Sequence, residues 1–225
     1  MCKRKNDIAG FCLMGLHFPI SAGIDLRGRR KGAKAAVKMT GAGFGFALFS
    51  PKDIADDIAA LKKVIKKNKA PLIPVLSYDD KYSYEGMEKS LDSCFALLYD
   101  FVDAFIIDGF GARPEVLDSL LNIRLYNDDY RPILLRVKDD LLSSELDELI
   151  SFALLSDIDG LAISNPRLLE KAKGRANGVL NLLFLGDFQE DAPFYCIKCR
   201  KGPFGEFISR FSALRLRRRI RRQQR

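Results

Sequence analysis

The sequence predicts one α/β domain built as a (βα)8 barrel, the compact form of the TIM barrel with shortened loops. The chain has 225 residues, of which 48% are hydrophobic and 29% are charged, which is the composition of a globular protein. Short apolar runs alternate along the chain with amphipathic stretches, as in βα units. The runs are apolar at nearly every position, which is typical of parallel strands that are buried on both faces.

Eight apolar runs are the expected strands. They cover residues 19–23, 43–49, 71–77, 104–109, 133–138, 160–165, 180–187 and 194–199. Only residues 188–193 separate the last two runs, and a crossover helix needs a longer connection. Either the helix between strands seven and eight is missing, or the βα pattern breaks down there.

Five amphipathic stretches are the expected helices. They cover residues 51–67, 84–101, 114–125, 143–155 and 203–222. For the first helix, Ser50 is the expected N-cap and Pro51 the first helical residue, where a proline costs no hydrogen bond. In the second, Leu91, Phe95 and Leu98 recur at helical spacing and predict the buried face.

The positive charge lies at one end of the chain. Residues 1–209 carry 29 basic and 29 acidic residues, whereas Arg210 to Arg225 include eight arginines and no acid. We therefore expect a barrel domain over residues 1–209 and a basic helix end or tail over residues 210–225. Such a tail either contacts a polyanion, RNA or an anionic lipid, through electrostatic attraction, or is a solvated terminus.

The cysteine and histidine content bears on compartment and metal binding. Five cysteines form no evident disulfide framework, so we expect a reducing, cytoplasmic setting. Cys196 and Cys199 form a lone C-x-x-C, and the only histidine, His17, is distant in sequence, so no metal site is expected. No apolar run reaches the roughly 18 residues of a transmembrane helix.

Motifs occur in a fixed order at the expected strands. The first carries Ala-Gly-Ile-Asp at residues 22–25, and the second opens with Gly-Phe-Gly-Phe at 43–46. Arg136 lies in the fifth run, Asn165 ends the sixth, and residues 195–203 hold a Tyr-Cys pair and a Gly-Pro pair. In this order the segments resemble the dihydroorotate dehydrogenase family of flavin barrels.

The resemblance implies that FMN lies across the carboxyl-terminal mouth of the barrel, with its phosphate held after strands seven and eight. The implied cofactor contacts are Ala22, Gly23, Arg136, Asn165, Gly186, Tyr195 and Cys196. Arg136 replaces the lysine of the family, and Asp187 stands where the family has a glycine. A carboxylate at residue 187 would repel a phosphate, and an arginine does not reproduce the compact geometry of a lysine.

The segment that should carry the catalytic base differs from the family pattern. The family has a serine or cysteine base among asparagines after strand four, whereas residues 108–114 read Asp-Gly-Phe-Gly-Ala-Arg-Pro. Asp108 is the only candidate proton acceptor in that loop, and the catalytic residues remain unassigned. Two hypotheses follow: an FMN-dependent oxidoreductase of the pyrimidine-biosynthesis type, or an inactive paralogue whose mouth binds a small molecule or serves as a scaffold.

Overall fold

Eight parallel strands form a closed ring in chain order. The computed structural model describes residues 22–26, 32–40, 46–51, 53–63, 71–77, 84–108, 114–176, 179–186 and 194–198. The strands are β1 (Ala22–Asp25), β2 (Phe46–Phe49), β3 (Leu72–Ser77), β4 (Phe105–Asp108), β5 (Ile133–Arg136), β6 (Gly160–Ile163), β7 (Asn181–Phe184) and β8 (Phe194–Lys198). Each strand pairs in parallel with its neighbours in sequence, and β1 also pairs with β8.

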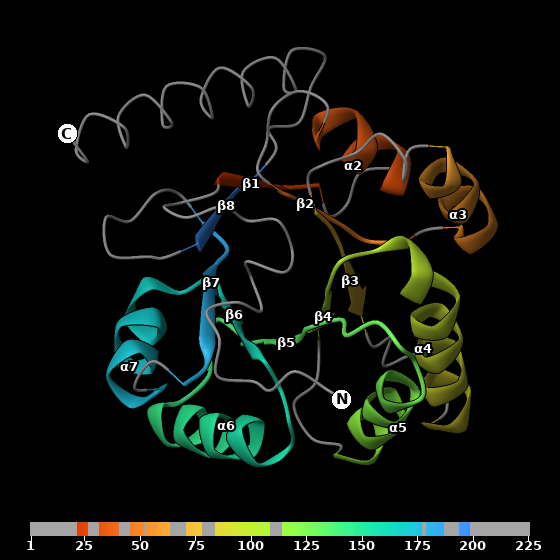
Figure 1. Ribbon diagram of the computed structural model, residues 1–225. Coiled ribbons are helices and arrows are strands. Elements are labelled where there is room, and N and C mark those ends of the chain that lie inside the picture. Colours follow the sequence, from red (N-terminus) through yellow and green to blue (C-terminus); the bar gives the residue numbers. More distant parts are fainter. Residues whose placement is uncertain are drawn as a thin grey trace.

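The helices of the described residues lie outside this ring (Figure 1). They are α2 (Gly32–Thr40), α3 (Ile54–Lys62), α4 (Tyr84–Leu98) with the 3-10 turn η1 (Tyr99–Phe101), α5 (Pro114–Leu125), α6 (Ser143–Leu155) and α7 (Pro166–Ala176). The alternation of strands and helices around a curled parallel sheet is as the sequence predicts. The full complement of eight helices is not shown, because residues 187–193 and 199–225 lie outside the described residues.

The core has two layers because successive strand residues point to opposite faces. One cluster of buried side chains joins strands to helices and therefore fills the outer layer, with members such as Phe49 of β2 and Phe95 of α4. The other cluster consists of strand residues and their immediate neighbours and fills the ring. Its members are Phe46, Leu48, Ile73, Val75, Ala104, Ile106, Leu134, Ala162, Leu183 and Leu185. The ring is thus a packed core and not a pore.

The helix expected at residues 51–67 has a different start and a different N-cap from those predicted. Helix α3 begins at Ile54, and Asp53 is its N-cap, with the Asp53 carboxylate accepting a hydrogen bond from the Asp56 backbone N–H at 3.1 Å. Ser50 and Pro51 instead belong to the connection after β2. An aspartate caps a helix as well as a serine does, so Asp53 takes the place of Ser50 as the N-cap.

Two helices have no counterpart among the expected ones. Helix α2 buries Ala33 and Ala36, whose small side chains give no wide apolar stripe in the sequence. Helix α7 buries Leu168, Leu169, Ala172 and Ala176 at helical spacing, and this signal was present in the sequence. The expected strand at 19–23 appears as β1 at Ala22–Asp25, and the expected helix at 203–222 lies outside the described residues.

No helix within the described ranges combines the length and the hydropathy that crossing a lipid bilayer requires.

Candidate ligand-binding site at the barrel mouth

Three polar residues lie at the carboxyl ends of three adjacent strands. Asp108 ends β4, Arg136 ends β5, and Ser164 follows the last residue of β6. Each stands two positions after an inward-facing residue, namely Ile106, Leu134 and Ala162. Because side chains two apart in a strand share a face, all three polar residues belong to the inner face, above the apolar filling of the ring.

Asp108 and Arg136 form an ion pair across β4 and β5. The Arg136 Nη1 donates a hydrogen bond to Asp108 Oδ2 at 2.5 Å. The side chain of Arg136 is 27% exposed and that of Asp108 is 23% exposed, so solvent or a ligand reaches both. The pair joins two residues with separate expected roles, the candidate proton acceptor and an expected cofactor contact.

Two polar atoms at this mouth have no hydrogen-bond partner among the described residues. They are Arg136 Nε and Ser164 Oγ, and both are buried. A buried donor without an acceptor costs about 1–3 kcal/mol, so such atoms usually have a partner in a folded protein. The two atoms are therefore the features of this mouth that a bound ligand would satisfy.

Asn165, an expected flavin contact, is placed beside the mouth with both of its polar atoms engaged. Its Nδ2 donates to the backbone oxygen of Asp139 at 2.9 Å, and its Oδ1 accepts from the backbone N–H of Arg167 at 2.9 Å. Asn165 therefore caps the start of α7 and links it by a hydrogen bond to the connection between β5 and α6.

The expected contacts in β1 and β8 are neighbours in the ring. Ala22 is paired with Tyr195, and Gly23 with Cys196. The structure thus brings together four residues that are far apart in sequence. They lie in the first halves of the two strands, however, whereas Asp108 and Arg136 lie at strand ends.

Gly186 lies two residues after β7, where it is in close contact with an aromatic ring. A Cβ atom at this position would lie 2.7 Å from two ring carbons of Phe184, so the packing of Phe184 favours glycine here. The neighbouring Asp187 lies outside the described residues.

The comparisons with known proteins match structure but not sequence. No protein family and no curated protein matches the chain. Among solved structures, the dihydroorotate dehydrogenase (DHODH) of Eimeria tenella in complex with ferulenol aligns with a TM-score of 0.63 and 12% identity, covering 77% of this chain and 71% of that one. The ligand-free enzyme of the same organism aligns with a TM-score of 0.61 and 11% identity, covering 77% and 74%.

The chain has the fold of DHODH. This likeness confirms the resemblance found in the sequence, and at 11–12% identity it is a likeness of fold. In barrels of this class, active sites lie at the carboxyl ends of the strands, whereas the opposite end serves stability. Asp108, Arg136 and Ser164 lie at the end where the DHODH-like fold is expected to hold a ligand.

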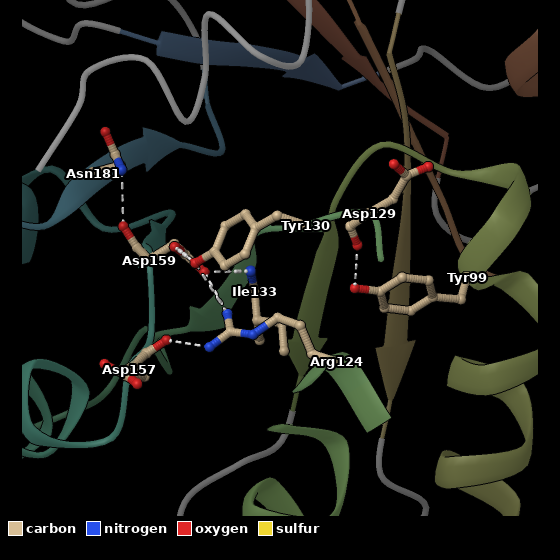
Figure 2. A network of polar contacts seen from close by, with 8 residues as sticks. All are labelled: Tyr99, Arg124, Asp129, Tyr130, Ile133, Asp157, Asp159 and Asn181. Carbon is tan, nitrogen blue, oxygen red and sulfur yellow. Dashed lines mark hydrogen bonds and ion pairs between the residues drawn. The ribbon is translucent and has the colours of Figure 1, made fainter. Parts of the chain in front are cut away.

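The opposite end of the DHODH-like barrel carries a buried polar network (Figure 2). Arg124 of α5 donates from Nη1 to Asp159 Oδ2 at 2.9 Å and from Nη2 to the backbone oxygen of Asp157 at 2.8 Å. The hydroxyl of Tyr130 donates to Asp159 Oδ1, and the guanidinium of Arg124 lies 4.9 Å from the centre of the Tyr130 ring. Asp159 precedes β6, so the network ties a helix to strand starts and has a structural role.

Sequence reasoning missed Ser164 and the pairing of Asp108 with Arg136. Ser164 has a visible signal, since it is a polar residue directly after the buried run of β6. The ion pair has none, because its partners are 28 residues apart and only the alignment of β4 with β5 brings them together.

Proposed function

We propose that the chain binds FMN at the carboxyl-terminal mouth and acts as a DHODH-type oxidoreductase. The observation that carries the proposal is the pair of unpartnered buried atoms, Arg136 Nε and Ser164 Oγ, at this mouth. A flavin ring offers carbonyl oxygens and ring nitrogens as acceptors, which fits a donor set of one guanidinium and one hydroxyl. The fold shared with DHODH structures supports the same location.

The cofactor, when bound, supplies the capacity to accept a hydride. Arg136 would orient it, and Ala22, Gly23, Gly186, Tyr195 and Cys196 complete the proposed contacts. Asn165 would have to give up one of its two hydrogen bonds to join them. These assignments follow from the resemblance, and the pairing of β1 with β8 is consistent with a shared contribution of those strands.

Asp108 is the proposed proton acceptor. Its Oδ2 is held by Arg136, and its Oδ1 has no hydrogen-bond partner among the residues that the structure describes. A substrate bound in the mouth could therefore give its proton to Oδ1 while the ion pair keeps the carboxylate in place. The pyrimidine-biosynthesis role, with dihydroorotate as the substrate, is proposed on the same resemblance.

Light absorption tests the proposal. The full chain, purified from a flavin-replete host, should carry or take up FMN, and added dihydroorotate should bleach the flavin band. Arg136→Gln removes a charged donor and should weaken FMN binding about tenfold or more. Arg175→Gln, which removes an exposed arginine paired with Asp147 on the outer helices, is the matched control and should bind FMN like the wild type.

The Asp108→Asn variant separates binding from chemistry. It should retain FMN and lose the bleaching by dihydroorotate, because an amide cannot accept the proton. A colourless wild-type protein that takes up no added FMN would refute the proposal. The hypothesis that the chain is an inactive paralogue with a binding or scaffold role would then remain.

Two further proposals rest on the sequence. We propose a cytoplasmic location from the odd number of cysteines, and contact with a polyanion through the arginines of residues 210–225. Those residues lie outside the described part of the chain.

A further inference from the structure

We infer that Arg136 and Ser164 form a subsite for an oxoanion, meaning a carboxylate or phosphate group of a small ligand, and that Asp108 keeps this subsite oriented. The inference shares the mouth with the proposed function and rests on it for that location. It differs in its ligand, because it requires an anionic group and does not require a flavin.

The first argument is the way in which Arg136 uses its donors. A guanidinium presents its N–H groups in a fixed planar fork, and Nε and Nη2 point outward along one edge. Within the described part of the chain, Nη1 is the donor in use, and its acceptor is Asp108. Nε is buried without a partner, and no acceptor within the described ranges lies at Nη2. The edge that remains has two parallel donors, which is the geometry that binds a carboxylate or phosphate bidentately.

The second argument is the position of Ser164. Arg136 is paired in the sheet with Ala162, and Ser164, which directly follows β6, stands one inward-facing position beyond Ala162. The two unpartnered atoms therefore belong to adjacent strands and to the same end and face of the ring. A hydroxyl there adds a neutral donor beside the guanidinium, and one oxoanion can accept from both.

The third argument is access and charge. Leu134, Ala162 and Leu183 fill the ring beneath the mouth, whereas the Arg136 side chain at the strand ends is partly exposed. Among the described residues, Asp108 compensates the positive charge of the guanidinium, and it does so at the Nη1 side. The ion pair thus fixes the plane of the guanidinium and leaves its free edge as the electropositive side. An oxoanion fits this edge, and a cation does not.

The test observes the Arg136 Nε–H directly. Arginine Nε–H groups give NMR signals, and comparison with the Arg136→Lys variant assigns the one from Arg136. The full chain is titrated with sodium acetate as the carboxylate probe and, separately, with sodium phosphate, while sodium chloride keeps the ionic strength constant. We expect a saturable shift of the Arg136 signal with one or both probes, and the probe that binds identifies the class of ligand. The Arg175 signal is the internal control.

Two variants make the outcome decisive. Ser164→Ala removes one hydroxyl and should weaken binding of the effective probe about three- to tenfold, because one hydrogen bond is lost. Arg136→Lys keeps the charge but removes the bidentate fork, so binding should be lost even though the charge remains. The inference is overturned if neither probe shifts the Arg136 signal, if chloride alone gives the same shift, or if Ser164→Ala binds as tightly as the wild type.

The result can be distinguished from that of the flavin experiment. Anion binding without FMN uptake would uphold the subsite and refute the proposed function. FMN uptake with no response to acetate or phosphate would do the reverse.

Discussion

Asp159 is the residue on which the polar contacts at the amino-terminal end of the barrel converge. Its carboxylate accepts hydrogen bonds from Arg124, from the Tyr130 hydroxyl and, at 2.8 Å, from the Ile133 backbone N–H. Its own backbone oxygen accepts from Asn181 Nδ2 at 2.9 Å. Because the side chains of Arg124 and Asp159 are only 6% and 10% exposed, this is a buried ion pair with its remaining hydrogen-bonding capacity largely used.

Removing the Asp159 carboxylate should therefore destabilise the fold strongly. Asp159→Ala leaves the Arg124 charge buried without its partner, which typically costs about 3–5 kcal/mol. Urea unfolding measures the change in the free energy of unfolding. Asp147→Ala, which removes the acid of the exposed pair with Arg175, is the matched control and should cost less than about 1 kcal/mol. Equal losses in the two variants would contradict the role given to the network.

Asp103 gives a prediction about pH. Burial raises the pKa of Asp103, and the hydrogen bond from the Leu72 backbone N–H, which favours the charged form, offsets this only in part. The folded chain therefore holds this proton more tightly than the unfolded chain does. The tighter proton binding at Asp103 adds to the free energy of unfolding in full below the ordinary pKa of 3.8. This addition is lost as the pH rises through the higher pKa of the folded state.

The Asp103→Asn variant should remove that pH dependence. The free energy of unfolding of the variant minus that of wild type should be larger at near-neutral pH than at a pH below 3.8. The reason is that the amide carries no charge, so its burial has no cost of desolvating a charge. Urea midpoints at the two pH values give the comparison. Asp128→Asn, at an exposed position, corrects for the loss of one negative charge. A relative stability that falls with rising pH would show that the sign of the pKa shift is wrong.

Residue pairs are the part of this molecule that the sequence could not predict. Arg124 reads as a polar residue of an amphipathic helix, and nothing in its neighbours marks it as 7% exposed. Its burial depends on Asp159, which is 35 residues away and becomes a partner only once α5 and β6 are in place. The same holds for Asp108 and Arg136 at the mouth.

At the scale of elements, Gly160 is needed for the pairing of β6 with β7. A Cβ atom at Gly160 would overlap the backbone oxygen of its partner residue Asn181. Gly160→Ala should therefore force the two strands apart and lower the free energy of unfolding by about 1–3 kcal/mol. Thermal or urea unfolding measures this change.

Gly174 in α7 is the matched control for that substitution. Apart from its chain neighbours and the nearby backbone of α7, no atom of the described residues lies within 4 Å of the position that its Cβ would take, so Gly174→Ala meets no obstacle there. Alanine is the better helix former, and the variant should gain about 0.5–1 kcal/mol. The two glycine variants should thus change stability in opposite directions, and a shared sign would contradict the packing described for β6.

Elements were predictable where their apolar residues are large. Leu91, Phe95 and Leu98 of α4 recur at helical spacing and are buried as expected. Helix α2 escaped prediction because its buried residues are alanines, whose burial leaves little trace in hydropathy. Strand existence was predictable from apolar runs, whereas strand bounds depend on how far the neighbouring strand extends.

At the scale of the whole molecule, the charge is divided between a neutral body and a basic end. Eight arginines and no acid lie in residues 210–225, so the full chain should bind heparin more tightly than a chain ending at Ser209. Retention on a heparin column at two salt concentrations measures this, and the difference should shrink at the higher salt. Equal retention of both chains would dismiss polyanion binding by the tail.

The architecture of the whole was the most predictable feature, and the ligand the least. Eight apolar runs, most of them separated by connections long enough for a crossover helix, predict a parallel sheet, and the number of strands predicts its closure. The ligand that binds at the mouth depends on the hydrogen-bonding groups that remain unpartnered once Asp108, Arg136 and Asn165 have formed their contacts. Those contacts depend on the folded structure and not on the local sequence.

The pairing of β1 with β8 affects the chain during its synthesis on the ribosome. On the ribosome, the first strand emerges long before its last neighbour has been translated. Until residues 194–198 leave the exit tunnel, the sheet of the nascent chain has two edge strands with unpaired backbone groups, and other chains can pair with them. A chain whose synthesis stops before residue 194 therefore leaves the edges of β1 and β7 without the partner strand β8, and such edges favour aggregation.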